Sequence, residues 1–80
     1  MSRYYFDLSN GSGFLRDTEG REVASIGAAK EVAAAELRGV ISGEISEGKA
    51  VSRTSFISVR CEGQGEVAKV CFCDAVTILE

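Results

Sequence analysis

The chain of 80 residues contains no histidine. Histidine is the side chain that most often acts as a general base, and it activates the nucleophile in Ser-His and Cys-His pairs. It is also the commonest transition-metal ligand. We therefore expect a protein that is not an enzyme, with no catalytic residues, no cofactor and no metal ion.

Long apolar runs are also absent, since no stretch approaches the roughly 20 residues with which a helix spans a bilayer. The segment from Met1 to Asp7 enters a strand-like pattern directly and lacks the apolar core of a signal peptide. Cysteine is scarce, and its three copies do not form a disulfide framework. We expect a cytoplasmic protein with no membrane partner.

Basic residues are too few for a typical nucleic-acid binder. Nine Lys and Arg residues face twelve Asp and Glu residues, and the net charge is −3. Proteins that bind nucleic acids usually present a basic face, because their affinity comes from replacing phosphate counterions. A regulatory role like that of antitoxin or RNA-binding domains would require a cluster of Arg3, Arg16, Arg53, Arg60 and Lys69.

Length and composition indicate a single folded domain over residues 1–80. Hydrophobic residues make up 45% of the chain and charged residues 26%, as in ordinary globular proteins. A chain this short buries only about 60% of its unfolded surface, so its stability margin is thin. Oligomerisation is a common way to widen that margin.

The N-terminal third has the pattern of a β-hairpin. Apolar and polar residues alternate from Arg3 to Ser9, Asn10-Gly11 is a strong turn signal, and Phe14 to Thr18 is expected to return as a strand. A two-residue turn would place Tyr5 opposite Arg16, whereas a four-residue loop would place Leu8 opposite Leu15. Asp17 is expected to bond nearby amides, and Gly20 to adopt a positive φ.

One helix is predicted, with Ser25 as its N-cap and a span from Ile26 to about Ser42 or one turn further. Gly43 is the candidate C-terminal stop, and residues 44–54 are expected to form a loop. Alanines favour the helix and allow close approach to a sheet. The apolar stripe comprises Ile26, Ala29, Ala33, Leu37, Val40 and Ile41.

Two further strands are predicted, from Ser55 to Cys61 and from Val67 to Leu79, joined by a turn at Gly63-Gln64-Gly65. Asp74 has the parity of the core face, so we expect either a bulge near Cys73 or a strand that outruns the helix. The predicted fold class is α+β, with order ββαββ and one helix on one face of a four-stranded, mainly antiparallel sheet. The first and fourth strands carry the densest apolar content, and we place them centrally.

A single helix leaves the other face of the sheet uncovered, and that face is unusually apolar. One interpretation is a partner surface, most simply the interface of a homodimer. The other is an open face covered by long side chains and the 44–54 loop. The candidate interface residues are Tyr5, Arg16, Phe56, Ser58, Arg60, Cys71 and Cys73.

Two groups of side chains could in principle support chemistry. Cys71 and Cys73 are expected to point the same way on a strand, about 6.5–7 Å apart at Cα, which suits a shared metal or thiol site better than a disulfide between them. A closed zinc site would need two more ligands, so half-buried apolar packing is the simpler interpretation. Asp7 and Asp17 have opposite parity and are not expected to converge; turn capping and solvation explain these acids better.

Three segments resemble a family of very short bacterial proteins of unknown function. They are the opening Arg-Tyr-Tyr-Phe-Asp-Leu (3–8), Asp-Thr-Glu-Gly (17–20) and Ala-Ala-Lys (28–30) within the helix. Members of that family begin Arg-Tyr-Phe-Phe-Asp-Leu and continue with Asp-x-x-Gly, an alanine-rich helix and a hairpin. The resemblance implies a compact autonomous domain and supplies no catalytic residues. This chain departs from the family in having Cys71 and Cys73 and in lacking proline after the helix. We hypothesise a non-catalytic interaction module that self-associates, with an unknown protein as the other possible partner.

Overall fold

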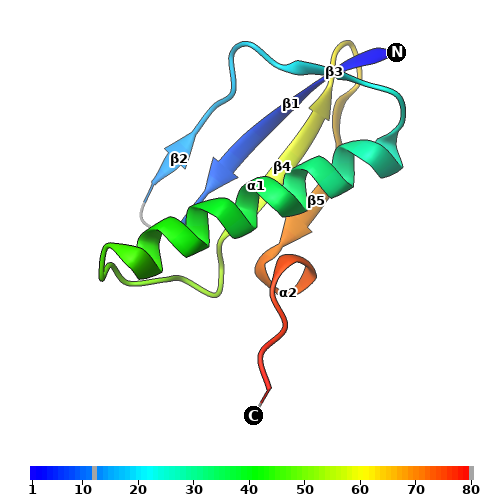
Figure 1. The fold of residues 1–80 in the computed structure, drawn as a ribbon. Coiled ribbons are helices and arrows are strands. Elements are labelled where there is room, and N and C mark those ends of the chain that lie inside the picture. The colour runs from blue at the N-terminus through cyan, green and yellow to red at the C-terminus, as the bar shows by residue number, and fades with distance from the viewer. Residues whose placement is uncertain (12, 80) are drawn as a thin grey trace.

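The computed structural model describes residues 1–11 and 13–79, so Ser12 of the predicted hairpin turn and Glu80 lie outside the described residues. The predicted α+β class is confirmed, with one main helix packed against an open antiparallel sheet (Figure 1). The elements in chain order are β1 (Ser2–Ser9), β2 (Phe14–Leu15), β3 (Arg21–Val23), α1 (Ile26–Ser46), β4 (Phe56–Cys61), β5 (Gly65–Cys71) and α2 (Phe72–Ala75).

The sheet has five strands in the order β2-β1-β4-β5, and β3 also pairs with β1. β4 occupies one edge of β1, so the short strands β2 and β3 share the other edge. The first predicted strand, β1, is central as expected, but the fourth predicted strand, which is β5, lies at an edge, so that part of the prediction is wrong. The other central strand is β4, because it pairs with both β1 and β5. Its Ile57 and Val59 are almost completely buried, at 2% and 0% exposure.

The β1–β2 hairpin adopts the four-residue-loop register. Leu8 lies opposite Leu15 and Ser9 opposite Phe14, while the Asn10 amide donates to the Gly13 carbonyl at 3.1 Å. The return strand ends at Leu15, so its predicted extension to Thr18 is wrong. The chain leaves the sheet edge after Leu15 and rejoins it at β3.

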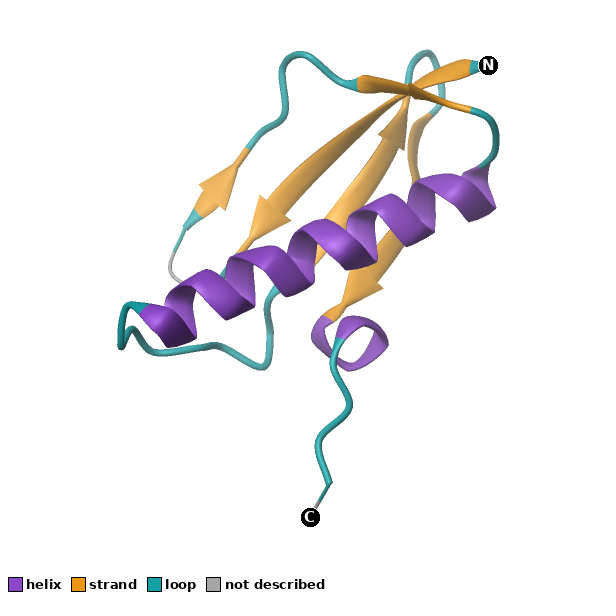
Figure 2. Cartoon of the chain, in the orientation of Figure 1, coloured by secondary structure: helices purple, strands orange, loops and turns teal. Residues whose placement is uncertain are grey.

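Helix α1 begins where the sequence predicts and ends one turn beyond Ser42, as the longer of the two predicted spans has it. The Ser25 hydroxyl accepts a hydrogen bond from the Ala28 amide at 3.1 Å, which caps the helix. The helix passes through the predicted stop at Gly43 and ends at Ser46, followed by Gly48 with φ of 73°. In Figure 2 it runs diagonally across one face of the sheet.

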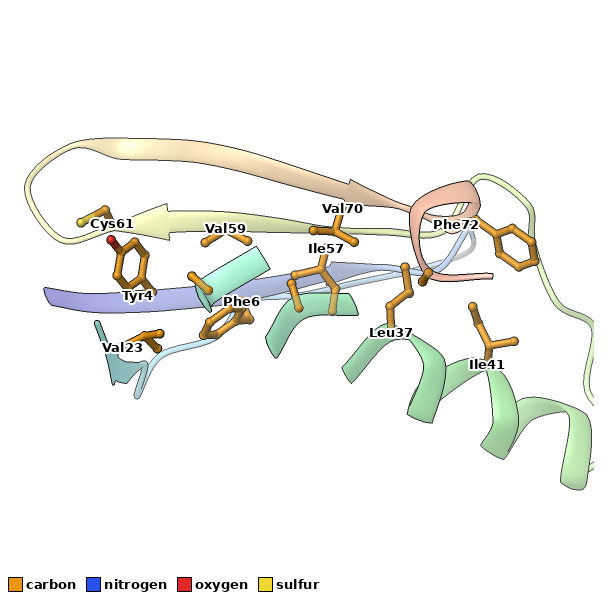
Figure 3. Close-up of a cluster of buried hydrophobic side chains, with 13 residues drawn as sticks. Tyr4, Phe6, Val23, Leu37, Ile41, Ile57, Val59, Cys61, Val70 and Phe72 are labelled. Carbon is orange, nitrogen blue, oxygen red and sulfur yellow. The ribbon is translucent and has the colours of Figure 1, made fainter. Parts of the chain in front are cut away.

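The core lies between α1 and that face of the sheet, as Figure 3 shows. Ala29, Ala33 and Leu37 have no exposed surface, because the small alanines bring the helix close to β4 and β5 while Leu37 fills the space beside them. The buried hydrophobic residues are Tyr4, Phe6, Val23, Ala29, Ala33, Leu37, Ile41, Ile57, Val59, Cys61, Val70, Phe72 and Ala75.

The predicted fourth strand ends early. β5 stops at Cys71, and the chain turns into the short helix α2. The Asp74 carboxylate accepts a hydrogen bond from the Cys71 amide at 2.9 Å, so Asp74 stabilises this turn and is solvent-exposed. Phe72 remains in the core at 8% exposure. The strand irregularity lies between Val59 and Arg60, and the expected bulge near Cys73 is wrong.

Candidate functional site on the helix-free face

The helix-free face is the side of the sheet opposite α1. Registers place the side chains of β1 in rows with those of its neighbours: Tyr5 is opposite Arg60, Asp7 opposite Ser58, and Ser9 opposite Phe56. The rows continue onto β5 through Lys69 and Cys71 and onto β2 through Phe14. The face comprises Arg3, Tyr5, Asp7, Ser9, Phe14, Glu22, Phe56, Ser58, Arg60, Glu66, Lys69 and Cys71.

An ion pair occupies the centre of this face. Arg60 Nε donates to Asp7 Oδ2 at 2.5 Å, and Arg60 Nη2 donates to Asp7 Oδ1 at 3.2 Å. The Asp7 side chain is 3% exposed and that of Arg60 is 22% exposed. Such a bidentate pair fixes both side chains, and it compensates the cost of burying the carboxylate.

Asp17 joins this pair from the segment between β2 and β3. Its amide donates to Asp7 Oδ1 at 2.9 Å, and its carbonyl accepts from Arg60 Nη2 at 3.0 Å. The two aspartates therefore converge, and the prediction that they do not is wrong. Parity along a continuous hairpin does not apply here, because the chain has already left the strand after Leu15.

The Asp17 carboxylate accepts a backbone hydrogen bond from β1 at a position where neither β2 nor β3 pairs with that edge. Oδ2 accepts the Phe6 amide of β1 at 3.0 Å, in the interval between the β2 and β3 pairings. Oδ1 accepts the amides of Glu19 and Gly20, both at 3.1 Å, as predicted for an Asp in a turn. Gly20 has the predicted positive φ, 71°.

Both aspartates are held in their charged form. Burial alone would raise the pKa of Asp7, but the hydrogen bonds from Arg60 and the Asp17 amide, with the charges of Arg60 and Arg16, lower it below its ordinary value of 3.8. Burial opposes ionisation of Asp17 as well, and the amides of Gly20, Phe6 and Glu19 lower its pKa. The hydrogen bond to Asp7 raises the pKa of Arg60.

Cations cover two aromatic rings of the face. The Arg60 guanidinium lies 4.7 Å from the centre of the Tyr5 ring, and Lys69 Nζ lies 4.5 Å from the centre of the Phe56 ring. Ser58 Oγ also donates to Glu66 Oε1 at 2.5 Å. Tyr5 thus has Arg60 of β4 as its cross-strand partner. The two-residue turn, the alternative register that would pair Tyr5 with Arg16, does not form.

Five of the seven predicted interface residues lie on this face. Arg16 is exposed just after β2, and Cys73 belongs to α2, so the expectation that Cys73 shares a strand face with Cys71 is wrong. The half-buried members are Tyr5, Phe56, Ser58, Arg60 and Cys71. Sequence reasoning missed Phe14, which lies opposite Ser9 and is 61% exposed, although the four-residue-loop register already implied its position.

The three cysteines are unpaired and dispersed. Cys61 is buried, Cys71 is half-buried, and Cys73 is exposed. Within residues 1–11 and 13–79, no three His, Cys, Asp or Glu side chains gather closely enough to hold a metal ion. In the same described ranges, neither helix combines the length and apolarity that crossing a membrane requires.

Comparison with protein families assigns residues 3–73 to a domain of unknown function, DUF6894. The chain belongs to this family. The match covers β1 from Arg3 onward, the other four strands and α1, so the family domain is the fold described above. No curated protein and no solved structure matches the chain. Functional inference for this DUF6894 domain therefore rests on its own geometry.

The lowered pKa values of Asp7 and Asp17 predict a loss of stability in acid. Unfolding restores an ordinary carboxyl pKa, so the unfolded chain takes up protons first as the pH falls. We expect the free energy of unfolding, measured by urea denaturation, to be nearly constant from pH 7 to about pH 5 and to decrease below about pH 4. Asp7→Asn should lower it by about 2–4 kcal/mol at pH 7, because Arg60 loses its charged partner, and should flatten the decrease in acid.

Glu31→Gln, at an exposed position of α1, is the matched control and should change neither quantity. An Asp7→Asn variant as stable as the unaltered protein at pH 7 would show that the ion pair contributes nothing net.

Gly20 and Gly48 form a matched pair, with φ of 71° and 73°. A Cβ at Gly20 would lie 2.8 Å from Tyr5 Cε1 and 2.9 Å from the Tyr4 carbonyl oxygen, whereas one at Gly48 would meet nothing within 4 Å. We expect Gly48→Ala to cost about 1–2 kcal/mol of unfolding free energy from backbone strain alone. Gly20→Ala should cost about 2–5 kcal/mol, since crowding adds to strain. Equal thermal shifts for the two variants would contradict the close packing of the turn against β1.

Proposed function

We propose that this protein is a non-catalytic interaction module that self-associates through the helix-free face. The observation that carries the proposal is an apolar row at one end of that face. Phe14 of β2 and Phe56 of β4 flank the small side chain of Ser9, and Cys71 of β5 lies beyond Phe56. Phe14 is 61% exposed, so this row offers an apolar surface to a partner.

The centre of the face supports the same role in a different way. Asp7 and Arg60 bond to each other and to Asp17, so this surface is rigid before any partner arrives. A rigid surface loses little conformational freedom on binding. Tyr and Arg are the residue types that most often dominate the binding energy of interfaces, and Tyr5 with Arg60 places one of each on the same face, two rows from the apolar row.

The alternative interpretation, a face covered by its own long side chains, accounts for part of the surface. Arg60 covers Tyr5 and Lys69 covers Phe56. It does not account for Phe14, which keeps most of its surface in solvent. A second copy of the chain is the simplest partner, because a two-fold axis would bury both copies of the apolar row against each other.

Light scattering coupled to size-exclusion chromatography tests this proposal. We expect a dimer whose dissociation constant rises at least tenfold in Phe14→Lys, since a charge would be buried in the contact. Ile26→Lys is the control: Ile26 is 43% exposed at the start of α1 and should leave the dimer intact. A strict monomer at millimolar concentration of the unaltered protein would refute self-association.

One observation favours a second candidate, a nucleic-acid-associated regulator. Arg3, Arg60 and Lys69 lie on the same face as both rings, and the charge of Arg16 acts on Asp7 beside them. Bases can stack on aromatic rings of a sheet whose cations bind the phosphates. Asp7 and Asp17 oppose this role because they already engage Arg60.

Fluorescence anisotropy with single-stranded DNA and RNA oligonucleotides discriminates between the candidates. A nucleic-acid role predicts binding that weakens steeply with salt and at least fivefold in Arg16→Ala. The interaction module predicts no anisotropy change at low salt. Arg38→Ala on α1, remote from the helix-free face, is the control for nonspecific charge effects.

A further inference from the structure

The exposed large apolar side chains of the described residues are two in β2, two in the C-terminal segment (residues 76–79), and Met1, Ile26 and Ile45. Phe14 and Leu15 of β2 are 61% and 68% exposed, and Ile78 and Leu79 are 44% and 93% exposed. Val76 has extended backbone angles, φ −131° and ψ 133°. Figure 1 shows the segment leaving α2 and extending away from the sheet.

The two outer edges of the sheet differ in their ability to accept another strand. On β5, the outward Cys71 amide is already bonded to Asp74 at 2.9 Å, Lys69 lies in mid-strand, and the pairing with β4 is irregular at Val59 and Arg60. A charged residue, an irregular register and a capped amide are devices that protect a strand edge from pairing.

The β2 edge is open by comparison. Asn10 and Gly13 are joined by an N–H to carbonyl bond, so the alternation of an antiparallel ladder turns the backbone groups of Phe14 outward. Within the described residues, no other strand pairs with that side of β2. A hollow of about 230 Å³ lies beside it, lined by Leu8, Asn10, Gly13, Phe14 and Leu15.

We infer that residues 76–79 of one copy add as a strand to the free edge of β2 in a second copy, with a branched side chain of the segment entering this hollow. The segment reads Val-Thr-Ile-Leu, and β-branched residues favour extended pairing. The inference rests on the proposed self-association and names a contact that the helix-free face does not provide. Reciprocal exchange of two segments closes a two-fold dimer.

The geometry favours a second copy over the same chain. β5 and β2 are opposite edges of the sheet, separated by three strand spacings of about 4.8 Å each, or about 14 Å. The segment follows α2 at the end of β5 and extends away from the sheet (Figure 1), so it does not lie along its own β2.

The test compares dimer dissociation constants of full-length variants. Ile78→Lys and Leu15→Lys should each weaken the dimer at least tenfold, while Ile26→Lys, matched to Ile78 in exposure at 43% against 44%, should not. Leu15 lies opposite Leu8, and both side chains are on the side of the sheet away from the helix-free face. The Leu15 substitution therefore tests the strand exchange without altering the apolar row of the helix-free face. Circular dichroism verifies that each variant is folded.

A second measurement uses two chains in a Cys73→Ser background, one carrying Leu15→Cys and the other Ile78→Cys. Mild oxidation of the mixture should produce a disulfide-linked heterodimer in at least tenfold excess over either linked homodimer. A dimer that is insensitive to Ile78→Lys, with no heterodimer enrichment, would overturn the segment exchange and leave the proposed function standing. A monomeric unaltered protein would overturn both.

Discussion

The buried ion pair between Asp7 and Arg60 is the interaction on which the sheet depends. It connects the two central strands, β1 and β4, and through Asp17 it connects both to the segment between β2 and β3. A carboxylate that is 3% exposed would cost several kcal/mol without a partner. The three groups therefore stabilise the fold only as a set, and each one fixes the position of the other two.

This set also determines how the face can act. Because its polar groups bond to one another, the side chains at the centre of the helix-free face are already ordered. Apolar surface remains at the end of the sheet, where Phe14 and Phe56 flank Ser9, and along β2.

Local patterns in the sequence predicted much of this architecture. Ser25 starts the helix, the alternation in β1 and β4 sets their buried faces, and Leu8 opposite Leu15 was one of two possible registers. The apolar run after Val67 misled the prediction, because an apolar residue such as Phe72 can be buried equally well from a strand or from a short helix. The prediction of strand order was wrong for β5, because the density of apolar residues in a strand does not reveal whether that strand has one neighbour or two.

The sequence alone determined β1, α1 and β4 and their buried sides, because hydrophobic period, capping and turn residues act over a few neighbouring positions. Only the tertiary structure decided that Asp7, Asp17 and Arg60 meet, since Arg60 lies 53 residues from Asp7 and its position depends on β4 pairing with β1. The tertiary structure also decided that the β2 edge of the sheet is open while the β5 edge is protected. The meeting of the three residues and the difference between the two edges both depend on long-range strand pairing, which no local pattern encodes.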